Sequence, residues 1–250
     1  MNRADFAVLV VFVAACGDNG KEPDYLGYDW DGRRVLCSDD LDNLDETVDV
    51  GFIHSQIEAA GKGGWALVLH AHQPTVTISN TWLDQVLTWA DQNRLAYYTF
   101  RELVPDAPAP KHPGLALAFD DDSVDDWMMS RQVLADHGAH VTYFVTRFTE
   151  LTPPELAELK VLYGDGHDIE PHTVNHLNAI DYVNMNGLDA YIANEVLPSF
   201  QVLVDAGYPP AAAFAYPFGA HTPEIDTAVL QYVDKVRTTP GECPWAGWGD

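Results

Sequence analysis

The segment that decides the fold reads Leu115-Ala-Leu-Ala-Phe-Asp-Asp-Asp122, a short apolar run that ends in consecutive carboxylates. A helical pattern follows over 123–137, and a second apolar run covers 141–145. A strand, a helix and another strand in this order are typical of a parallel sheet with a helical crossover. The segment therefore predicts a β-α-β unit whose first strand delivers carboxylates at its C-terminal end.

The same alternation extends in both directions along the chain. We expect strands at 34–37, 65–70, 95–100, 115–119, 141–145, 167–171, 213–217 and 233–237. We expect helices at 48–60, 81–94, 123–137, 153–163, 188–204 with an interruption at Pro198, and 223–232. Regular alternation favours an α/β fold, here a (β/α) barrel of about seven strands. In such barrels the chemistry lies at the C-terminal ends of the strands.

Length and charge narrow the class of protein. The chain has 250 residues with 47% hydrophobic content, which suits one large domain. Its 13 basic and 38 acidic residues give a net charge of −25. So acidic a chain repels phosphate backbones and anionic lipids, which argues against nucleic-acid binding and electrostatic membrane binding. No apolar run approaches the roughly 20 residues that span a bilayer.

The N-terminus has the pattern of an export signal. An apolar stretch ends in Val13-Ala14-Ala15-Cys16, which resembles the lipid-attachment motif of bacterial lipoproteins. We expect a signal peptide over 1–16 with lipidation at Cys16, a polar tether over 17–28 and a single barrel domain over 29–250. The alternative is an ordinary signal cut near Ala15. The first reading predicts an exported bacterial lipoprotein, in the cell envelope or outside the cell, that meets the membrane only through its lipid anchor.

Two further cysteines, Cys37 and Cys243, remain if Cys16 is lipidated. An even number of cysteines in an exported protein favours one disulfide between them. The alternative is a pair of free buried thiols.

Three expected strand ends carry reactive side chains. Asp120 and Asp121 follow the strand at 115–119, and His172 and His176 follow the strand at 167–171. A carboxylate and two histidines are typical of a catalytic divalent-metal site with an open position for water. The second carboxylate can then serve as a general base. The alternatives are helix capping by the aspartates and a chance His-x-x-x-His pair among 10 histidines.

Four segments together resemble the polysaccharide deacetylase family, the NodB-like domain of carbohydrate esterase family 4. They are Phe119-Asp-Asp121, Val141-Thr-Tyr-Phe-Val145, Gly166-His-Asp-Ile-Glu-Pro-His-Thr-Val-Asn-His176 and Phe214-Ala-Tyr-Pro-Phe-Gly219. The resemblance covers 115–239, half of the chain. It implies an enzyme that removes N-acetyl groups from an amino-sugar polysaccharide with a divalent metal, most often zinc, with cobalt or nickel as alternatives.

The resemblance also assigns roles to individual positions. It implies that Asp120 is the general base and that the metal ligands are Asp121, His172 and His176. It places an oxyanion or substrate site at Phe218, whose backbone N–H faces the oxyanion, with Tyr216 and Thr173 beside it.

Two positions depart from the family pattern. Ala215 stands where the third motif usually has an arginine that orients the base, and Asp122 stands where a glycine is usual. A carboxylate base beside a dication needs a fixed donor. We expect Arg237, at the end of the neighbouring strand, to orient Asp120 in its place. The alternative is a surface arginine paired with one of the many acids.

The last motifs of the family stand before the first ones here. The segments 65–72 and 95–103 resemble the family's C-terminal part, and the proline-rich linker 104–114 follows them. We therefore expect a circular permutation whose new ends lie after Arg237 and before Val35. His70 or His72 would be the general acid, and the sequence leaves both open. The alternative is an unrelated N-terminal subdomain attached to a truncated deacetylase.

Several details stay open at this level. Asp29-Trp30, Trp245 and Trp248 are candidates for the fourth motif, and the acidic run over 39–49 is expected to be a solvated loop. The expected partner is an acetylated polysaccharide. Alternative functions are O-deacetylation of a xylan-like glycan, amide hydrolysis of a small cyclic substrate, and sugar binding by an inactive lipoprotein.

Overall fold

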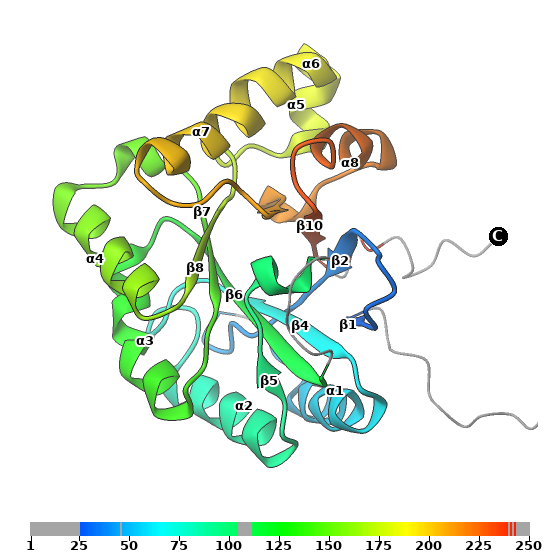
Figure 1. Ribbon diagram of the computed structural model, residues 1–250, viewed down its shortest axis with the longest axis vertical. Helices are drawn as coiled ribbons and strands as arrows, with labels where there is room; N and C mark the ends of the chain where they lie inside the picture. The colour runs from blue at the N-terminus through cyan, green and yellow to red at the C-terminus, as the bar shows by residue number, and fades with distance from the viewer. Residues whose placement is uncertain (1–25, 46, 105–111, 240, 242, 244–250) are drawn as a thin grey trace, which may run out of the picture.

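The computed structural model describes residues 26–45, 47–104, 112–239, 241 and 243. Figure 1 shows helices arranged around a central group of strands. The strands are β1 (Gly27–Tyr28), β2 (Val35–Cys37), β3 (Asp39–Asp40), β4 (Ala66–Ala71), β5 (Ala96–Tyr97), β6 (Gly114–Asp121), β7 (Thr142–Val145), β8 (Asp168–Pro171), β9 (Ala213–Ala215) and β10 (Lys235–Thr238). Within this part of the chain, no helix is long and apolar enough to cross a membrane.

Helices connect the strands on the outside. They are α1 (Val50–Gly63), α2 (Asn80–Gln92), α3 (Val124–His137), α4 (Pro153–Gly164), α5 (Ala179–Asn186), α6 (Leu188–Tyr191), α7 (Leu197–Asp205) and α8 (Pro223–Val229). Short 3₁₀ helices lie at η1 (Phe100–Leu103), η2 (Phe148–Glu150) and η4 (Pro217–Gly219). A π-helical segment lies at η3 (Ile192–Val196). Gly64 ends α1 in the left-handed conformation, at φ 88°.

The strands form a (β/α) barrel, as the sequence predicts. β4, β6, β7 and β8 pair in parallel in that order, and β10 pairs in parallel with β9 and β2. The two sheets meet at β2 and β3, since β3 pairs with β4 and Ser38 alone separates them. At the opposite seam, the Glu170 carboxylate of β8 accepts hydrogen bonds from Ala212 and Ala213 at the start of β9. The barrel is therefore closed by strand pairing on one side and by a side chain on the other.

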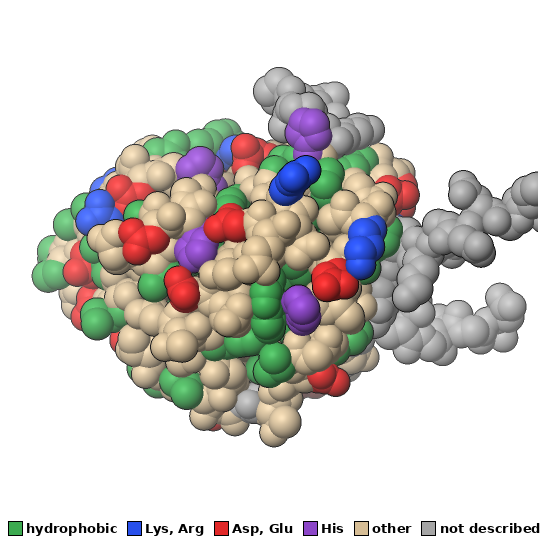
Figure 2. Space-filling model, turned by 90° about the horizontal axis from the view of Figure 1, so that it is seen from below, with side chains coloured by type: hydrophobic (Ala, Val, Ile, Leu, Met, Phe, Trp, Pro, Cys, Tyr) green, Lys and Arg blue, Asp and Glu red, His purple; other side chains and the backbone are tan. Residues whose placement is uncertain are grey.

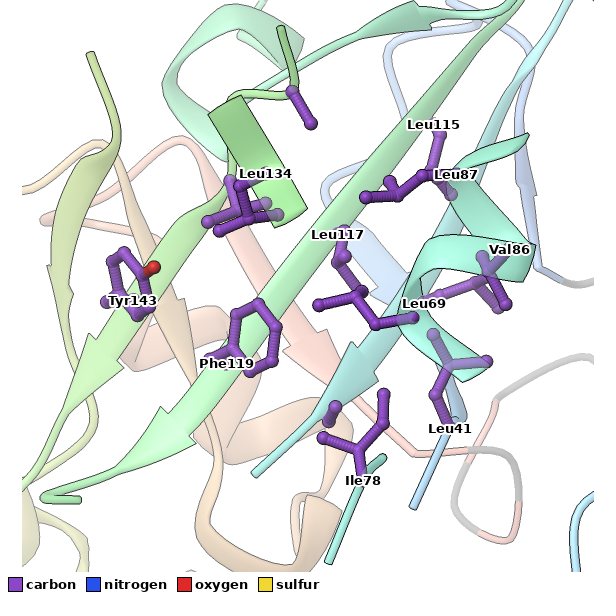
Figure 3. Packing of buried hydrophobic residues seen from close by; sticks show 14 of the residues in the cluster. Leu41, Leu69, Ile78, Val86, Leu87, Leu115, Leu117, Phe119, Leu134 and Tyr143 are labelled. Atoms are coloured by element: carbon purple, nitrogen blue, oxygen red, sulfur yellow. The ribbon is translucent and has the colours of Figure 1, made fainter. Parts of the chain in front are cut away.

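Alternation along the strands separates two layers of core. Figure 3 shows Leu115, Leu117 and Phe119 of β6 among the side chains of the outer cluster, which includes Leu87 and Leu134 of the helices. The intervening residues of the same strands point into the barrel, where alanines are frequent because little space remains. This parity places Asp120 of β6 and His70 of β4 inside the barrel.

The upstream segments belong to the same barrel as the rest of the chain. Val35 of β2 lies opposite Val236 of β10, and Leu67 of β4 lies opposite Leu115 of β6. β2 and β10, which are far apart in sequence, lie side by side in Figure 1. The alternative of an unrelated N-terminal subdomain is therefore wrong. The arrangement is the one that a circular permutation predicts, and the permutation itself stays an inference.

Three element predictions need correction. The strand expected at 95–100 ends after Tyr97, because the chain turns at η1 to bury Phe100 and Leu103 and is fixed by a capping box of Thr99 and Glu102. The single helix expected at 188–204 is divided into α6 and α7 by the π-helical segment η3. Pro198 stands in the first turn of α7. The eight-residue helix α5 was not predicted.

The expected boundaries also change. The tether predicted at 17–28 is too long, because Tyr28 is buried and β1 pairs with β4 in antiparallel fashion. Gly114 belongs to β6 rather than to the linker. Trp30 packs on Tyr28 and Tyr98 at the N-terminal end of the barrel, so it forms no wall of the site. The signal peptide, Cys16, most of the linker, Trp245 and Trp248 lie outside the described residues.

Candidate active site

The expected metal ligands converge at the C-terminal end of the barrel. Asp121 ends β6, and His172 and His176 follow β8. The Nε2 atoms of His176 and His172 lie 3.0 Å and 3.8 Å from Asp121 Oδ1. One ligand atom from each residue lies within 4.8 Å of those of the other two. Two imidazoles and a carboxylate so close together form a donor set that suits a divalent metal such as zinc.

Neighbouring groups orient these three side chains. His172 Nδ1 lies 2.8 Å from the Ala215 carbonyl oxygen, so it carries the proton and leaves Nε2 for a metal. Burial lowers the pKa of His172 to about 4, which keeps its ring neutral. Asp121 and His176 hold positive φ angles of 86° and 57°. Such backbone conformations are rare outside glycine and are common at functional sites.

The Asp121 carboxyl is charged in this environment. Burial opposes ionisation, but a hydrogen bond with His176 and the electrostatic interaction with the nearby histidines lower its pKa below the usual value. Its Oδ1 atom is buried and faces the Nε2 atom of neutral His172. Lone pairs that face one another in this way favour a cation between them. The residues present therefore fit a divalent metal.

Asp120 and Arg237 form an ion pair inside the barrel. Arg237 Nη2 donates a hydrogen bond to Asp120 Oδ2, and the two side chains are only 1% and 3% exposed. In the strand ladder Arg237 of β10 lies opposite Ala215 of β9. The small side chain at 215 leaves room for the guanidinium. The side chain of Arg237 thus points inward, and the neighbouring strand supplies the arginine that position 215 lacks.

A hydrogen-bonded chain continues from this ion pair. Arg237 Nη1 donates to Ser38 Oγ at 3.2 Å, and Ser38 Oγ bonds His70 Nδ1 at 3.0 Å. His70 is buried, and burial together with the Arg237 charge lowers its pKa well below 6.5. Ser38 lies between β2 and β3, where the two sheets meet. The seam of the barrel therefore connects Asp120 to His70.

His72 lies in a different electrostatic environment. Burial opposes protonation, but a short hydrogen bond with the Asp42 carboxylate and the charges of Asp120, Asp42 and Asp40 raise its pKa to about 9. Its side chain is 30% exposed, against 3% for His70. His72 is therefore protonated at neutral pH and reaches solvent, whereas His70 is neutral and enclosed.

These groups share one cavity of about 440 Å³ at the end of the barrel. Its lining includes both aspartates of the β6 end and four histidines, which are His70, His72, His172 and His176. A larger cavity of about 580 Å³ lies near α3, beside Arg131, His140 and His167. The smaller cavity is the candidate active site because it brings a buried carboxylate paired with an arginine, a protonated imidazole and a metal-binding set together.

The residues expected at the oxyanion or substrate site divide into two groups. Phe218 is 64% exposed at the cavity rim, with φ 60° and its ring 4.8 Å from that of His176. Tyr216 packs its buried ring on Phe214 and His221, so only its backbone can meet a substrate. Thr173 is buried, and its Oγ1 accepts a hydrogen bond from the His176 backbone N–H. Its position suits fixing a ligand better than contacting a substrate.

The cysteines lie next to the site. Cys37 and Cys243 form a disulfide that joins the end of β2 to the segment after β10. Cys37 directly precedes Ser38, which bonds both His70 and Arg237. The disulfide therefore links the segment of Ser38, which bonds Arg237 and His70, to the segment after β10.

Sequence reasoning missed the acids of 39–49. The prediction of a solvated loop is wrong for Asp40 and Asp42, because β3 pairs with β4 and brings both acids to the histidines. Asp42 is 3% exposed, and Asp49 caps α1. The run contains Asp at 40 and 42, a spacing of two that matches the period of a strand, and this was the available signal.

Comparisons with known proteins identify the family of this chain. A family model described as polysaccharide deacetylase matches residues 107–236. This is just over half of the chain, and the protein belongs to the polysaccharide deacetylase family. A search of the curated proteins finds no match.

Solved structures of similar fold include several deacetylases. The Streptococcus pyogenes deacetylase PplD in complex with acetate is 22% identical, with TM-score 0.51, covering 66% of this chain and 79% of that one. IcaB from Ammonifex degensii is 17% identical, with TM-score 0.58 and coverage of 70% and 84%. A de-N-acetylase from Aggregatibacter actinomycetemcomitans is 13% identical, with TM-score 0.55 and coverage of 67% and 85%. At these identities the likeness concerns the fold.

Proposed function

We propose that this protein is a metal-dependent hydrolase that removes N-acetyl groups from an amino-sugar polysaccharide. One observation carries the proposal: Asp120 is buried, paired with Arg237 and adjacent in sequence to the Asp121–His172–His176 group. A metal bound by that group would polarise the acetyl carbonyl and lower the pKa of a bound water. Zinc suits the two imidazoles and one carboxylate best.

Asp120 is the proposed general base. Arg237 bonds its Oδ2, whereas its buried Oδ1 has no hydrogen-bond partner among the described residues, and Asp120 lines the cavity. Oδ1 is therefore the atom that takes the proton of the attacking water. Arg237 holds the carboxylate in one rotamer through its hydrogen bond to Oδ2. The backbone N–H of Phe218 is placed at the rim to donate to the oxygen on which charge develops.

His72 is the proposed general acid. Protonation of the leaving amine requires a group that carries a proton at neutral pH and reaches the cavity. His72 meets both requirements because Asp42 raises its pKa to about 9 and its ring is partly exposed. His70 meets neither and instead supports Arg237 through Ser38. The structure thus favours one of the two histidines that the sequence leaves open.

The surroundings favour an uncharged glycan. Asp39, Asp40, Asp120 and Asp121 line the cavity and repel anionic substrates. The exposed Phe218 ring offers an apolar face for a sugar ring. On the face in Figure 2, acidic side chains are spread over the surface rather than gathered in a patch. We further propose that the protein is an exported lipoprotein anchored through Cys16, which intact-mass analysis of the membrane-extracted protein would test.

The decisive experiment measures acetate release from a panel of N-acetylated and O-acetylated glycans. We expect release from N-acetylglucosamine polymers, loss after chelation, and recovery when zinc is returned. Preference for acetylated xylan would support the O-esterase alternative instead. No release from any member, with zinc bound, would favour a sugar-binding protein without activity.

A further inference from the structure

A second group of ligand-type side chains lies in the same cavity as the first. Asp40, His70 and His72 each offer an atom, and these atoms lie within 4.8 Å of one another. His70 Nε2 is 3.6 Å from Asp40 Oδ2, and His72 Nδ1 is 3.9 Å from it. The group shares no residue with Asp121, His172 and His176. Two imidazoles and a carboxylate again form a donor set for zinc.

Both imidazoles are oriented as metal-binding histidines usually are. His70 Nδ1 is held by Ser38 Oγ, which leaves Nε2 directed at Asp40. His72 Nδ1, the nitrogen nearer Asp40, is held by the buried Asp42 carboxylate, so Nε2 is the His72 nitrogen that would bind an ion. A metal-binding histidine typically bonds a carboxylate or another oxygen through the nitrogen that does not touch the metal. The outer partners of a second site are therefore already in place.

The group of Asp40, His70 and His72 is open to solvent and lies in a negative electrostatic potential, and both features favour binding of a cation. Asp40 and His72 are 26% and 30% exposed through their side chains, so an ion can enter from solvent. Asp39 and Asp42 add further carboxylates close by. Two ions in the same cavity repel one another, so the ion that binds second is held more weakly, and we assign this weaker ion to the group of Asp40.

We propose that Asp40, His70 and His72 bind a second divalent cation, zinc by its donor set, and that this ion inhibits the enzyme. The inhibitory half rests on the proposed function, in which His72 donates a proton to the leaving amine. A nitrogen whose lone pair binds a metal cannot carry that proton. The rate of deacetylation should therefore increase when an ion binds the first group and decrease when a second ion binds the group of Asp40.

Zinc binding to the metal-free full chain tests the site without reference to activity. Isothermal titration calorimetry, with zinc content after equilibrium dialysis, is expected to give a tight and a weaker site in the native protein. Asp40→Asn should lose the weaker site and keep the tight one, which also shows that the variant is folded. Asp39→Asn, a matched change one residue away, should keep both. A single site in the native protein, or two sites in Asp40→Asn, would overturn the proposal.

Acetate release over a zinc titration tests the inhibition. We expect native activity to fall at excess zinc by about a hundredfold, the size of a general-acid contribution. The ratio of activity at low and high zinc should stay near unity in Asp40→Asn. Two bound ions with no fall in native activity would overturn the inhibitory role. A protein inactive at every zinc concentration would overturn the proposed function. The number of zinc ions bound would still show whether the second site exists.

Discussion

At the scale of single residues, the site contains a guanidinium that comes from the strand next to the one that carries Ala215. Ala215 cannot orient a carboxylate, and Arg237, opposite it in the ladder, reaches Asp120 from inside the barrel. Arg237→Ala should lower kcat by about ten- to a hundredfold, the usual effect of losing an outer partner. Metal content should be unchanged. Arg237→Lys keeps the charge but lacks the planar guanidinium that bonds Asp120 and Ser38 at the same time, so it should recover only part of the activity. Unchanged turnover in Arg237→Ala would reject this role.

The pH dependence of activity tests the assignment of the general acid to His72 rather than to His70. The pKa of His72 is raised to about 9, so the acid is present below that pH and activity should fall as the pH rises through it. Asp42→Asn removes the partner that raises this pKa and should move the alkaline limb to lower pH by about one to three units. A pH–rate profile of kcat measures the limb. If the limb does not move in Asp42→Asn, His72 is not the acid.

At the scale of elements, the disulfide joins β2 to the segment that follows β10. Cys37 and Cys243 are 206 residues apart in sequence, so the bond closes a long loop of the unfolded chain. Replacing both cysteines with serine should lower the free energy of unfolding by about 2–4 kcal/mol. Urea unfolding of the native and variant proteins measures this, and reduced native protein should match the variant. Equal stability of all three would show that the bond contributes nothing.

At the scale of the whole molecule, the order of the chain differs from the order of the barrel. Segments 26–104 and 112–239 close one barrel, with β2 beside β10 and β4 beside β6. We therefore expect a reordered chain, beginning at His112, running to Asp250 and continuing from Gly17 to Val104, to fold and release acetate. Circular dichroism and the acetate assay measure the outcome. An insoluble or unfolded reordered chain would argue against the permutation.

The sequence predicted the barrel because its strands are nearly continuous apolar runs between helical patterns. It predicted the metal-binding group because ligands at the ends of parallel strands must meet at one end of the barrel. It missed Asp42, since the role of this acid depends on the pairing of β3 with β4 across about thirty residues, which no local pattern records. It missed β1 because a two-residue strand has no periodicity.

The central claim is that Asp120 takes a proton from water beside the metal-binding group. The most direct measurement is acetate release by Asp120→Asn, together with its zinc content. The amide nearly preserves the shape of the side chain but cannot take the proton, so we expect zinc to stay bound while turnover falls by about 10²–10⁴-fold. Native-like acetate release from zinc-loaded Asp120→Asn would contradict the account and place the base elsewhere.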